Sequence, residues 1–185
     1  MAPRAREARR GAAASHARGK ARRTGATPLK RIGIVDTSFA RYDMAAAAID
    51  ELRAQGGGFT VDRYTVPGIK DLAAGARILF DRGCDLVIAL GMVGREKVDK
   101  DCALAADFGL QSVQARVGRH ILGVMVHEEE ADDEPRLAWL FDRRTREHAM
   151  NAYDLLFRPE AIRARAGTGQ REGFPDAGPL KERVV

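Results

Sequence analysis

Residues 31–38 read RIGIVDTS, and this stretch decides the fold. Ile32 to Val35 form an apolar run without polar alternation, and the polar residues Asp36, Thr37 and Ser38 follow it directly. Such a run is typical of a buried strand that ends in a turn. Residues 86–90 (LVIAL) have the same character. Because strands that are apolar throughout occur in sheets covered on both faces, the two runs predict a parallel sheet.

Helical and strand patterns alternate outward from these runs. We expect strands at 32–35, 59–66, 86–90 and 121–126, with Gly91 closing the third, and helices at 43–56, 69–83, 98–113 and 133–157. Asp43 is the expected cap of the first helix, and the glycines 56–58 are its expected stop. The sequence therefore predicts an α/β three-layer sandwich with a four-stranded parallel flavodoxin-like sheet. We expect one α/β domain over residues 30–166.

The charge is concentrated at the N-terminus. The chain has 185 residues and a net charge of +5, yet residues 1–31 hold ten basic residues and one acidic residue. We expect residues 1–29 to be a disordered basic tail, with an organelle transit peptide as the alternative, and residues 167–185 to be an extended tail. The remaining body is mildly acidic, which argues against a duplex-binding fold and leaves weak nucleic-acid contact to the basic tail.

Apolar runs and cysteines define the expected compartment. No apolar run approaches the roughly 18 residues that span a bilayer. The two cysteines have no CxxC spacing, and both are expected to be core residues. These features predict a protein of the reducing cytoplasm.

Ligands of parallel sheets bind at the carboxyl ends of the strands, here residues 36–39, 66–71 and 91–97. No GxGxxG or GxxxxGK[ST] motif is present, which excludes the usual dinucleotide and triphosphate sites. Phe39 is either a hydrophobic staple on the next helix or a ring that stacks on a flat ligand. Pro67-Gly68 allows close backbone approach to a ligand, although turns use the same pair. Lys70 and Asp71 are expected to pair with each other in solvent.

Polar residues near the last helix allow several interpretations. Arg144 and His148 interrupt its apolar stripe, so they either bond inside the monomer or face a neighbouring subunit or a ligand; the second is favoured. The acids 128–130 and 132–134 precede this helix, and we expect them to be solvated and to complement its dipole rather than to hold a metal. His127 lacks partners at metal-ligand spacing.

Several segments together resemble one enzyme family, the archaeal-type riboflavin synthases. They are residues 34–44 (IVDTSFARYDM), 65–72 (TVPGIKDL), 89–92 (ALGM), 126–128 (VHE), 143–144 (RR), 147–149 (EHA), 173–174 (GF) and 176–180 (DAGPL). The resemblance covers nearly everything from Lys30 onward. It implies a lumazine synthase-like fold and a homopentamer with sites at subunit interfaces. The implied reaction converts two molecules of 6,7-dimethyl-8-ribityllumazine into riboflavin and 5-amino-6-ribitylamino-2,4-pyrimidinedione, without an organic cofactor. The resemblance also allows a Mg²⁺ requirement.

The resemblance also implies a set of site residues. Phe39 corresponds to the aromatic residue that stacks on the heterocycle. The expected substrate-binding residues are Thr37, Ser38, Phe39, Val66, Pro67, Gly68, Ile69, Lys70, Gly91, Met92 and Val93, joined by Leu122 and His127 from the neighbouring subunit. The candidates for proton transfer are Lys97, Asp71 and His148. Arg144 or Lys70 is expected to stabilise charge that develops on a ring oxygen.

Two alternatives remain from the sequence. The first is lumazine synthase, which condenses the pyrimidinedione with butanone phosphate. That enzyme follows its third strand with a glycine-threonine phosphate cradle and a histidine, whereas residues 92–97 (MVGREK) contain neither; this favours riboflavin synthase. The second is a non-catalytic flavodoxin-like binding module whose Arg-rich tail contacts nucleic acid.

Overall fold

The computed structural model describes residues 28–171 and 175–180. Four parallel strands form one sheet in the order β2-β1-β3-β4. The strands are β1 (Lys30–Thr37), β2 (Phe59–Val66), β3 (Leu86–Val93) and β4 (Ile121–His127). The strand order reverses between β1 and β3, so the two loops that leave these strands diverge and open a crevice at the carboxyl edge.

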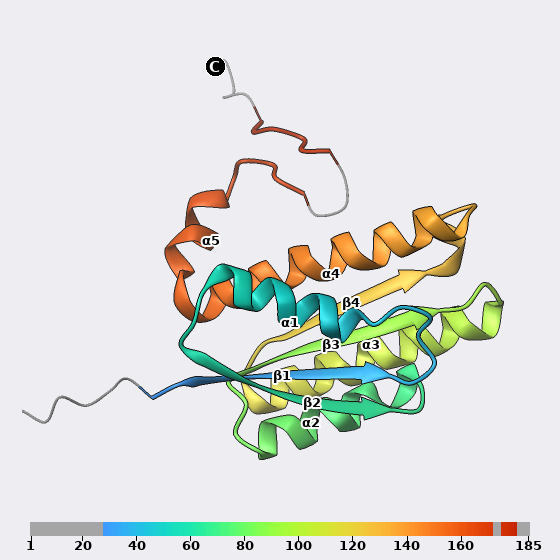
Figure 1. Ribbon diagram of the computed structural model, residues 1–185, viewed down its shortest axis with the longest axis horizontal. Helices are drawn as coiled ribbons and strands as arrows, with labels where there is room; N and C mark the ends of the chain where they lie inside the picture. The colour runs from blue at the N-terminus through green and yellow to red at the C-terminus, as the bar shows by residue number, and fades with distance from the viewer. Residues whose placement is uncertain (1–27, 172–174, 181–185) are drawn as a thin grey trace, which may run out of the picture.

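Helices cover both faces of the sheet (Figure 1). One face carries α1 (Met44–Gln55) and α4 (Glu134–Phe157), and the other carries α2 (Leu72–Asp81) and α3 (Lys97–Val117). Short 3₁₀ turns η1 (Ile69–Asp71) and η2 (Glu128–Glu130) precede α2 and α4, and α5 (Pro159–Arg165) follows α4. The predicted three-layer α/β sandwich with a four-stranded parallel sheet is therefore confirmed.

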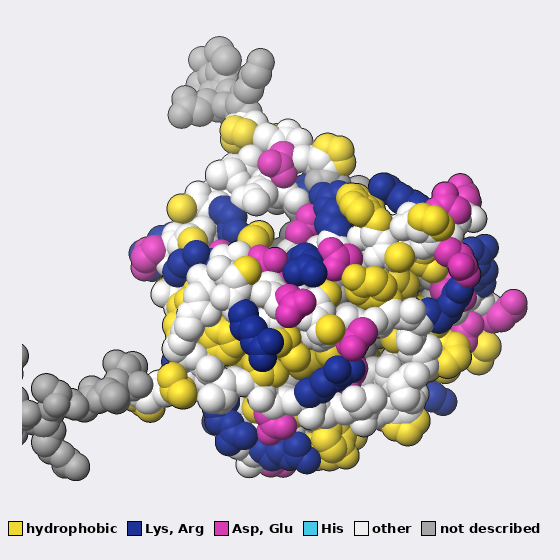
Figure 2. Space-filling view, viewed as in Figure 1, with side chains coloured by type: hydrophobic (Ala, Val, Ile, Leu, Met, Phe, Trp, Pro, Cys, Tyr) yellow, Lys and Arg dark blue, Asp and Glu magenta, His cyan; other side chains and the backbone are white. Residues whose placement is uncertain are grey.

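The core consists of two apolar layers on either side of the central strands. All eight residues of β3 are buried. Ile32, Ile34 and Phe141 belong to the layer under α1 and α4, whereas Val35 and Leu79 belong to the layer under α2. Successive strand residues point to opposite faces, so a strand between two helical layers must be apolar at every position. On the face of the molecule seen in Figure 2, Lys and Arg side chains are interspersed with Asp and Glu.

Helix boundaries follow the expected capping chemistry. The Asp43 carboxylate accepts a hydrogen bond from the Ala46 amide at 3.0 Å and caps α1. Asp133 accepts one from the Arg136 amide at 2.7 Å and caps α4. Each cap satisfies an amide that the first helical turn leaves without a backbone partner. Both predicted helix starts are thus confirmed.

The predicted end of the third strand is wrong. β3 continues through Gly91 to Val93 and pairs with β4 as far as His127. Gly91 is required by packing: a Cβ atom there would lie 2.6 Å from the Met125 sulfur and 3.1 Å from Ile69 Cγ2. A glycine in a strand interior often marks such a close approach rather than a turn. In addition, α5 was not predicted, and α3 continues four residues beyond its expected end.

The tails are described only in part. Residues 1–27 of the predicted basic tail lie outside the described residues, as do Gly173 and Phe174 of the resemblance motif. In the described part of the C-terminal segment, the Ala177 amide donates a hydrogen bond to the Gly169 carbonyl at 2.9 Å, which folds the segment back on itself. Within residues 28–171 and 175–180, no helix has the length and apolar character needed to cross a membrane.

Candidate active site at the carboxyl edge of the sheet

A cavity of about 240 Å³ opens at the carboxyl ends of β1, β2 and β3. It lies where the strand order reverses, the position at which ligands of open parallel sheets bind. Its lining comes from the β1–α1 loop, the β2–α2 turn, the end of β3 and the first turns of α3. The lining residues are Phe39, Pro67, Gly68, Ile69, Lys70, Asp71, Met92, Gly94, Asp99 and Cys102.

Phe39 provides an uncovered aromatic surface on this cavity. Its side chain is 64% exposed, although burying a phenylalanine ring is normally favourable by a few kcal/mol. A hydrophobic staple would be packed against α1, so the exposure excludes that interpretation. The ring is available to stack on a flat ligand.

The two loops beside Phe39 are held together by backbone contacts. The Ser38 amide donates to the Val66 carbonyl at 2.9 Å, and the Ser38 hydroxyl donates to the Pro67 carbonyl at 3.4 Å. The Asp71 amide donates to the Gly68 carbonyl at 3.0 Å and closes the η1 turn. These bonds fix Phe39 relative to the Pro67-Gly68 backbone.

Lys70 and Asp71 both line the cavity. Among the ion pairs of the described residues, none joins these two side chains, so the expected solvent pair is wrong. An ammonium and a carboxylate therefore face the same cavity as the aromatic ring. This combination can orient polar groups of a ligand and transfer protons.

Several of the other predicted binding residues do not line the cavity. Thr37, Val66, Gly91 and Val93 are buried in their strands and do not line the cavity, whereas Met92 does. Successive strand residues point to opposite faces, so only some residues of a segment can reach a given cavity. Thr37 instead lines a separate hollow together with Ser38, which also does not line the cavity.

The first turns of α3 contribute Asp99 and Cys102, and Gly94 lies in the preceding turn. Gly94 lies within the predicted segment 91–97 without having been named as a site residue, whereas the sequence analysis missed Asp99 and placed Cys102 in the core. The spacing of Asp99 and Cys102, three residues apart on a helix, is the signal that could have found them. The predicted Lys97 side chain is instead 87% exposed and pairs with Asp101 at 2.6 Å.

Arg144 is hydrogen-bonded inside the subunit. Its guanidinium donates to the Met125 carbonyl at 2.9 Å and to both carboxylate oxygens of Glu130, at 2.8 and 2.6 Å. The side chain is 18% exposed, so it has the designated partner that a part-buried arginine requires. The structure thus shows the first of the two interpretations, bonding inside the monomer; that Arg144 also faces a neighbouring subunit or a ligand stays a prediction. His148 Nδ1 lies 2.9 Å from the Arg144 carbonyl oxygen.

The acids of η2 form ion pairs with the β1–α1 loop, α3 and α4. Glu128 pairs with Arg41 at 3.4 Å, Glu129 with Lys100 at 2.6 Å, and Glu130 with Arg144. Hydrogen bonds from Lys100 and Arg144 lower the pKa values of Glu129 and Glu130, respectively, because they favour the charged carboxylates. The expectation that this run is simply solvated is corrected.

A metal ion bound by this chain alone would need several ligating side chains close together. No group of three or more His, Cys, Asp or Glu side chains within residues 28–171 and 175–180 is arranged to hold a metal ion. This finding concerns sites built from several protein ligands, whereas Mg²⁺ usually keeps several waters and is bound by one or two carboxylates.

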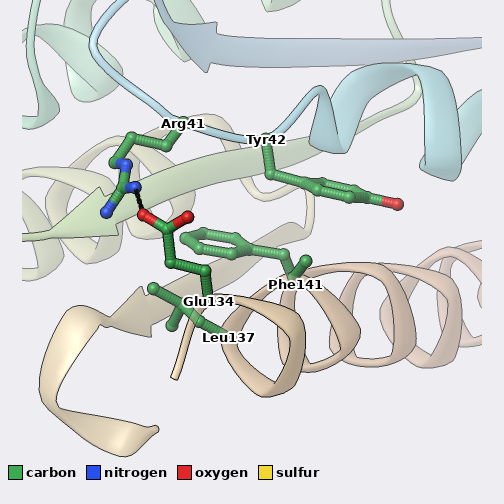
Figure 3. Close-up of a pocket in the computed structure, with 6 residues that line it drawn as sticks. Arg41, Tyr42, Glu134, Leu137 and Phe141 are labelled. Atoms are coloured by element: carbon green, nitrogen blue, oxygen red, sulfur yellow. Dashed lines mark hydrogen bonds and ion pairs between the residues drawn. The ribbon is translucent and has the colours of Figure 1, made fainter. Parts of the chain in front are cut away.

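A second cavity, of about 180 Å³, lies on the other face of the sheet (Figure 3). The Tyr42 ring lies over Phe141 with centroids 5.9 Å apart and planes 9° from parallel. Arg41 forms an ion pair with Glu134 beside them. The Tyr42 hydroxyl donates to Asp142 at 2.9 Å, and burial and this carboxylate raise the pKa of Tyr42. The polar groups of this cavity are paired with one another, and these contacts attach the β1–α1 loop to α4. We therefore interpret the cavity as part of the packing between the loop and the helix.

The comparisons with known proteins agree with this arrangement. The family model for 6,7-dimethyl-8-ribityllumazine synthase matches residues 29–160. The riboflavin synthase of Methanothermobacter thermautotrophicus is 52% identical over 151 residues, 81% of this chain and 99% of that protein. Those of Archaeoglobus fulgidus and Aeropyrum pernix are 46% and 45% identical, over 81% and 82% of this chain and 98% and 99% of theirs. This chain belongs to the archaeal-type riboflavin synthase family.

The predicted site residues of this riboflavin synthase family member fall into two separate groups. The cavity group surrounds Phe39 on the side of α2 and α3. Leu122 and His127 on β4, and Arg144 and His148 on α4, do not line that cavity. Leu122 packs against the core layer under α1 and α4. Since α4 covers the opposite face of the sheet from α3 (Figure 1), one chain does not bring the two groups together.

Proposed function

We propose that this chain is a riboflavin synthase that converts two molecules of 6,7-dimethyl-8-ribityllumazine into riboflavin and 5-amino-6-ribitylamino-2,4-pyrimidinedione. A four-carbon unit moves from one lumazine to the other, so the two substrates exchange electrons between themselves and no organic cofactor is required. The observation that carries the proposal is the exposed Phe39 ring beside the Pro67-Gly68 backbone and the Lys70 and Asp71 side chains. A lumazine is flat with a polyol tail, and it needs such a platform and such polar groups.

The chain's residues act mainly by binding and by proton transfer. Holding two lumazines face to face makes their encounter intramolecular, which supplies much of the acceleration. A base must remove a proton from the 7-methyl group of one lumazine, and the resulting carbanion attacks the other ring. Asp71 is the carboxylate of the cavity group that we assign to this step, with Lys70 stabilising charge on a ring oxygen.

The remaining predicted residues enter from a neighbouring subunit. A cavity of about 240 Å³ is below the roughly 300–1,000 Å³ of ordinary ligand pockets, and two lumazines need more. We infer that a second copy completes the site with Leu122, His127 and His148. Arg144 contributes by fixing Glu130, and Lys97 would act only if assembly brings it to substrate.

Exposed apolar residues on α3 support self-association. Val98, Leu104 and Phe108 are 63%, 57% and 68% exposed. Exposed apolar side chains gathered on one helix are typical of a protein–protein contact. We propose a homopentamer, as the resemblance implied; sedimentation velocity on purified protein tests the stoichiometry.

Lumazine synthase is the alternative within the same fold, because the matching family model has that description. The relatives at 45–52% identity are instead named riboflavin synthases. Their names and the missing glycine-threonine cradle after β3 favour our proposal. Supplying the pyrimidinedione with butanone phosphate separates the two activities, since only lumazine synthase consumes the phosphate.

The compartment and the accessory requirements remain parts of the proposal. We place the enzyme in the cytoplasm, which is compatible with two unpaired cysteines. Turnover after EDTA treatment, with and without added Mg²⁺, tests the metal requirement. A salt-dependent gel shift that is lost on deleting residues 1–27, together with no lumazine turnover, would support the nucleic-acid-binding module instead.

The decisive experiment is incubation of the purified chain with 6,7-dimethyl-8-ribityllumazine alone. We expect riboflavin fluorescence to appear as the lumazine is consumed in a two-to-one ratio. Single substitutions of Lys97, Asp71 and His148, measured in single turnovers, test the proton-transfer assignments. No riboflavin from the wild-type chain would refute the function, and near-normal rates in all three variants would refute the assignments.

A further inference from the structure

The connection between β3 and α3 places an acidic side chain, Asp99, in the cavity. Asp99 belongs to the first turn of α3 and lines the same cavity as Phe39 and Lys70. Its carboxylate accepts a hydrogen bond from the Glu96 amide at 3.2 Å, and the Glu96 side chain accepts one from the Asp99 amide. The chain's own carboxylates therefore occupy the position where a helix start would bind an anion.

Gly94 lets this carboxylate lie against the β3–α3 turn. A Cβ atom at Gly94 would be 2.2 Å from Asp99 Oδ2 and 2.8 Å from its Cγ. Any residue other than glycine would force the Asp99 side chain to move. The position of the Asp99 carboxylate thus depends on the glycine at position 94, and both residues line the cavity.

The basic side chains of this segment, which could neutralise an incoming anion, already have other partners. Lys97 pairs with Asp101, and Lys100 pairs with Glu129. Arg95 donates to the backbone carbonyls of Glu128 and Ala131, at 3.2 and 3.4 Å. The charged side chains of the lining itself are Lys70, Asp71 and Asp99, so the acids outnumber the cation.

We infer that Asp99 is a specificity-determining residue, which weakens the binding of phosphorylated compounds in the cavity and so favours an uncharged heterocycle. The inference rests on the proposed function, because it explains how one fold rejects a sugar phosphate and accepts a second lumazine. A phosphate entering here would approach the Asp99 carboxylate, and the Glu96 and Asp99 amides of the capping box are already hydrogen-bonded. Repulsion of this kind is the usual route to discrimination between similar partners.

The test compares phosphate inhibition in the wild type and in Asp99→Asn. Asparagine keeps an oxygen that can accept the Glu96 amide, so the substitution removes the charge and preserves the cap. Two unit charges about 4 Å apart in a water-like medium repel by about 1 kcal/mol, which is about fivefold in affinity. We expect inorganic phosphate to inhibit lumazine turnover by D99N at a concentration about fivefold lower than for the wild type, at constant ionic strength.

Asp107→Asn is the matched control. Asp107 is exposed on the same helix and does not line the cavity, so D107N removes an equal charge without changing the site. Its phosphate inhibition constant is expected to equal that of the wild type. Gly94→Ala is a second variant, which displaces the Asp99 carboxylate without removing its charge, and it is expected to increase phosphate sensitivity in the same direction as D99N.

The result separates this inference from the proposed function. Equal phosphate inhibition constants for the wild type, D99N and G94A, with all three active, would overturn the role of Asp99. If the wild type makes no riboflavin, the proposed function fails, and stabilisation of each variant by phosphate in thermal unfolding then decides the inference alone. A larger phosphate-induced shift for D99N than for D107N supports it, and equal shifts overturn it.

Discussion

Replacing Phe39 by alanine should weaken lumazine binding without unfolding the protein. The ring is 64% exposed, so most of a side-chain surface of about 200 Å² faces solvent. A stacked heterocycle covers one face, about 60 Å², which is worth about 1.5 kcal/mol at 25 cal/mol per Å². Stacking adds about 0.5–1.5 kcal/mol. The loss of about 2–3 kcal/mol corresponds to binding that is about 30- to 140-fold weaker.

Equilibrium binding of the lumazine, followed by its own fluorescence, measures this loss directly. Phe39→Trp is the matched control because it keeps an aromatic platform, and it should bind within a few-fold of the wild type. Phe39→Leu should lie between, since leucine keeps apolar surface without a flat ring. The thermal midpoint of F39A should be nearly unchanged, because the ring contributes little packing to the folded chain. Wild-type affinity in F39A would refute the placement of the substrate on this ring.

Three further predictions concern pairs and packing that the structure defines. Glu130→Gln removes a carboxylate whose pKa is lowered by Arg144, so it should cost about 1–2 kcal/mol at pH 7. A lowered pKa stabilises the fold above the unfolded value of about 4.3, so the difference from the wild type, measured by urea unfolding, should vanish as the pH falls below about 4. Gly75→Ala should destabilise the chain by about 1 kcal/mol in the same assay, because a Cβ there lies 2.6 Å from a valine methyl of β1; an increase in stability would contradict the close packing of α2. Burial raises the pKa of Cys84 to about 11, so a thiol reagent at pH 8 should modify Cys102 and leave Cys84 intact, with lumazine slowing the reaction; rapid labelling of both thiols would exclude this arrangement.

The fold was predictable because its information is local. The apolar runs at 32–35 and 86–90 lie between helical layers, and this requires side chains of one kind on both faces of a strand. Asp43 and Asp133 marked helix starts, since a capping carboxylate acts within three residues. Gly91 was misread because a turn and a close approach both select glycine, and the Met125 side chain that decides between them comes from another strand.

The part of the candidate site that lies at the strand ends could be predicted from the sequence. The part that depends on which face of a helix is turned to the cavity could not. Phe39, Gly68 and Met92 converge because parallel strands direct their carboxyl ends to one edge. The sequence analysis named Lys97 and did not consider Asp99, which lies two residues further along the helix and therefore points to nearly the opposite side. The helix orientation that selects Asp99 follows from how α3 packs on the sheet.

The sequence by itself determined the layers, the strand edge and the aromatic platform, because periodicity and turn chemistry act between neighbours in the chain. Tertiary structure alone decided which partner each charged residue receives. Arg144 forms an ion pair with Glu130 across the β4–α4 connection, and Lys100 forms one with Glu129. Such pairs join segments that the chain brings together only on folding, and nothing in the spacing of either residue specifies the distance between them.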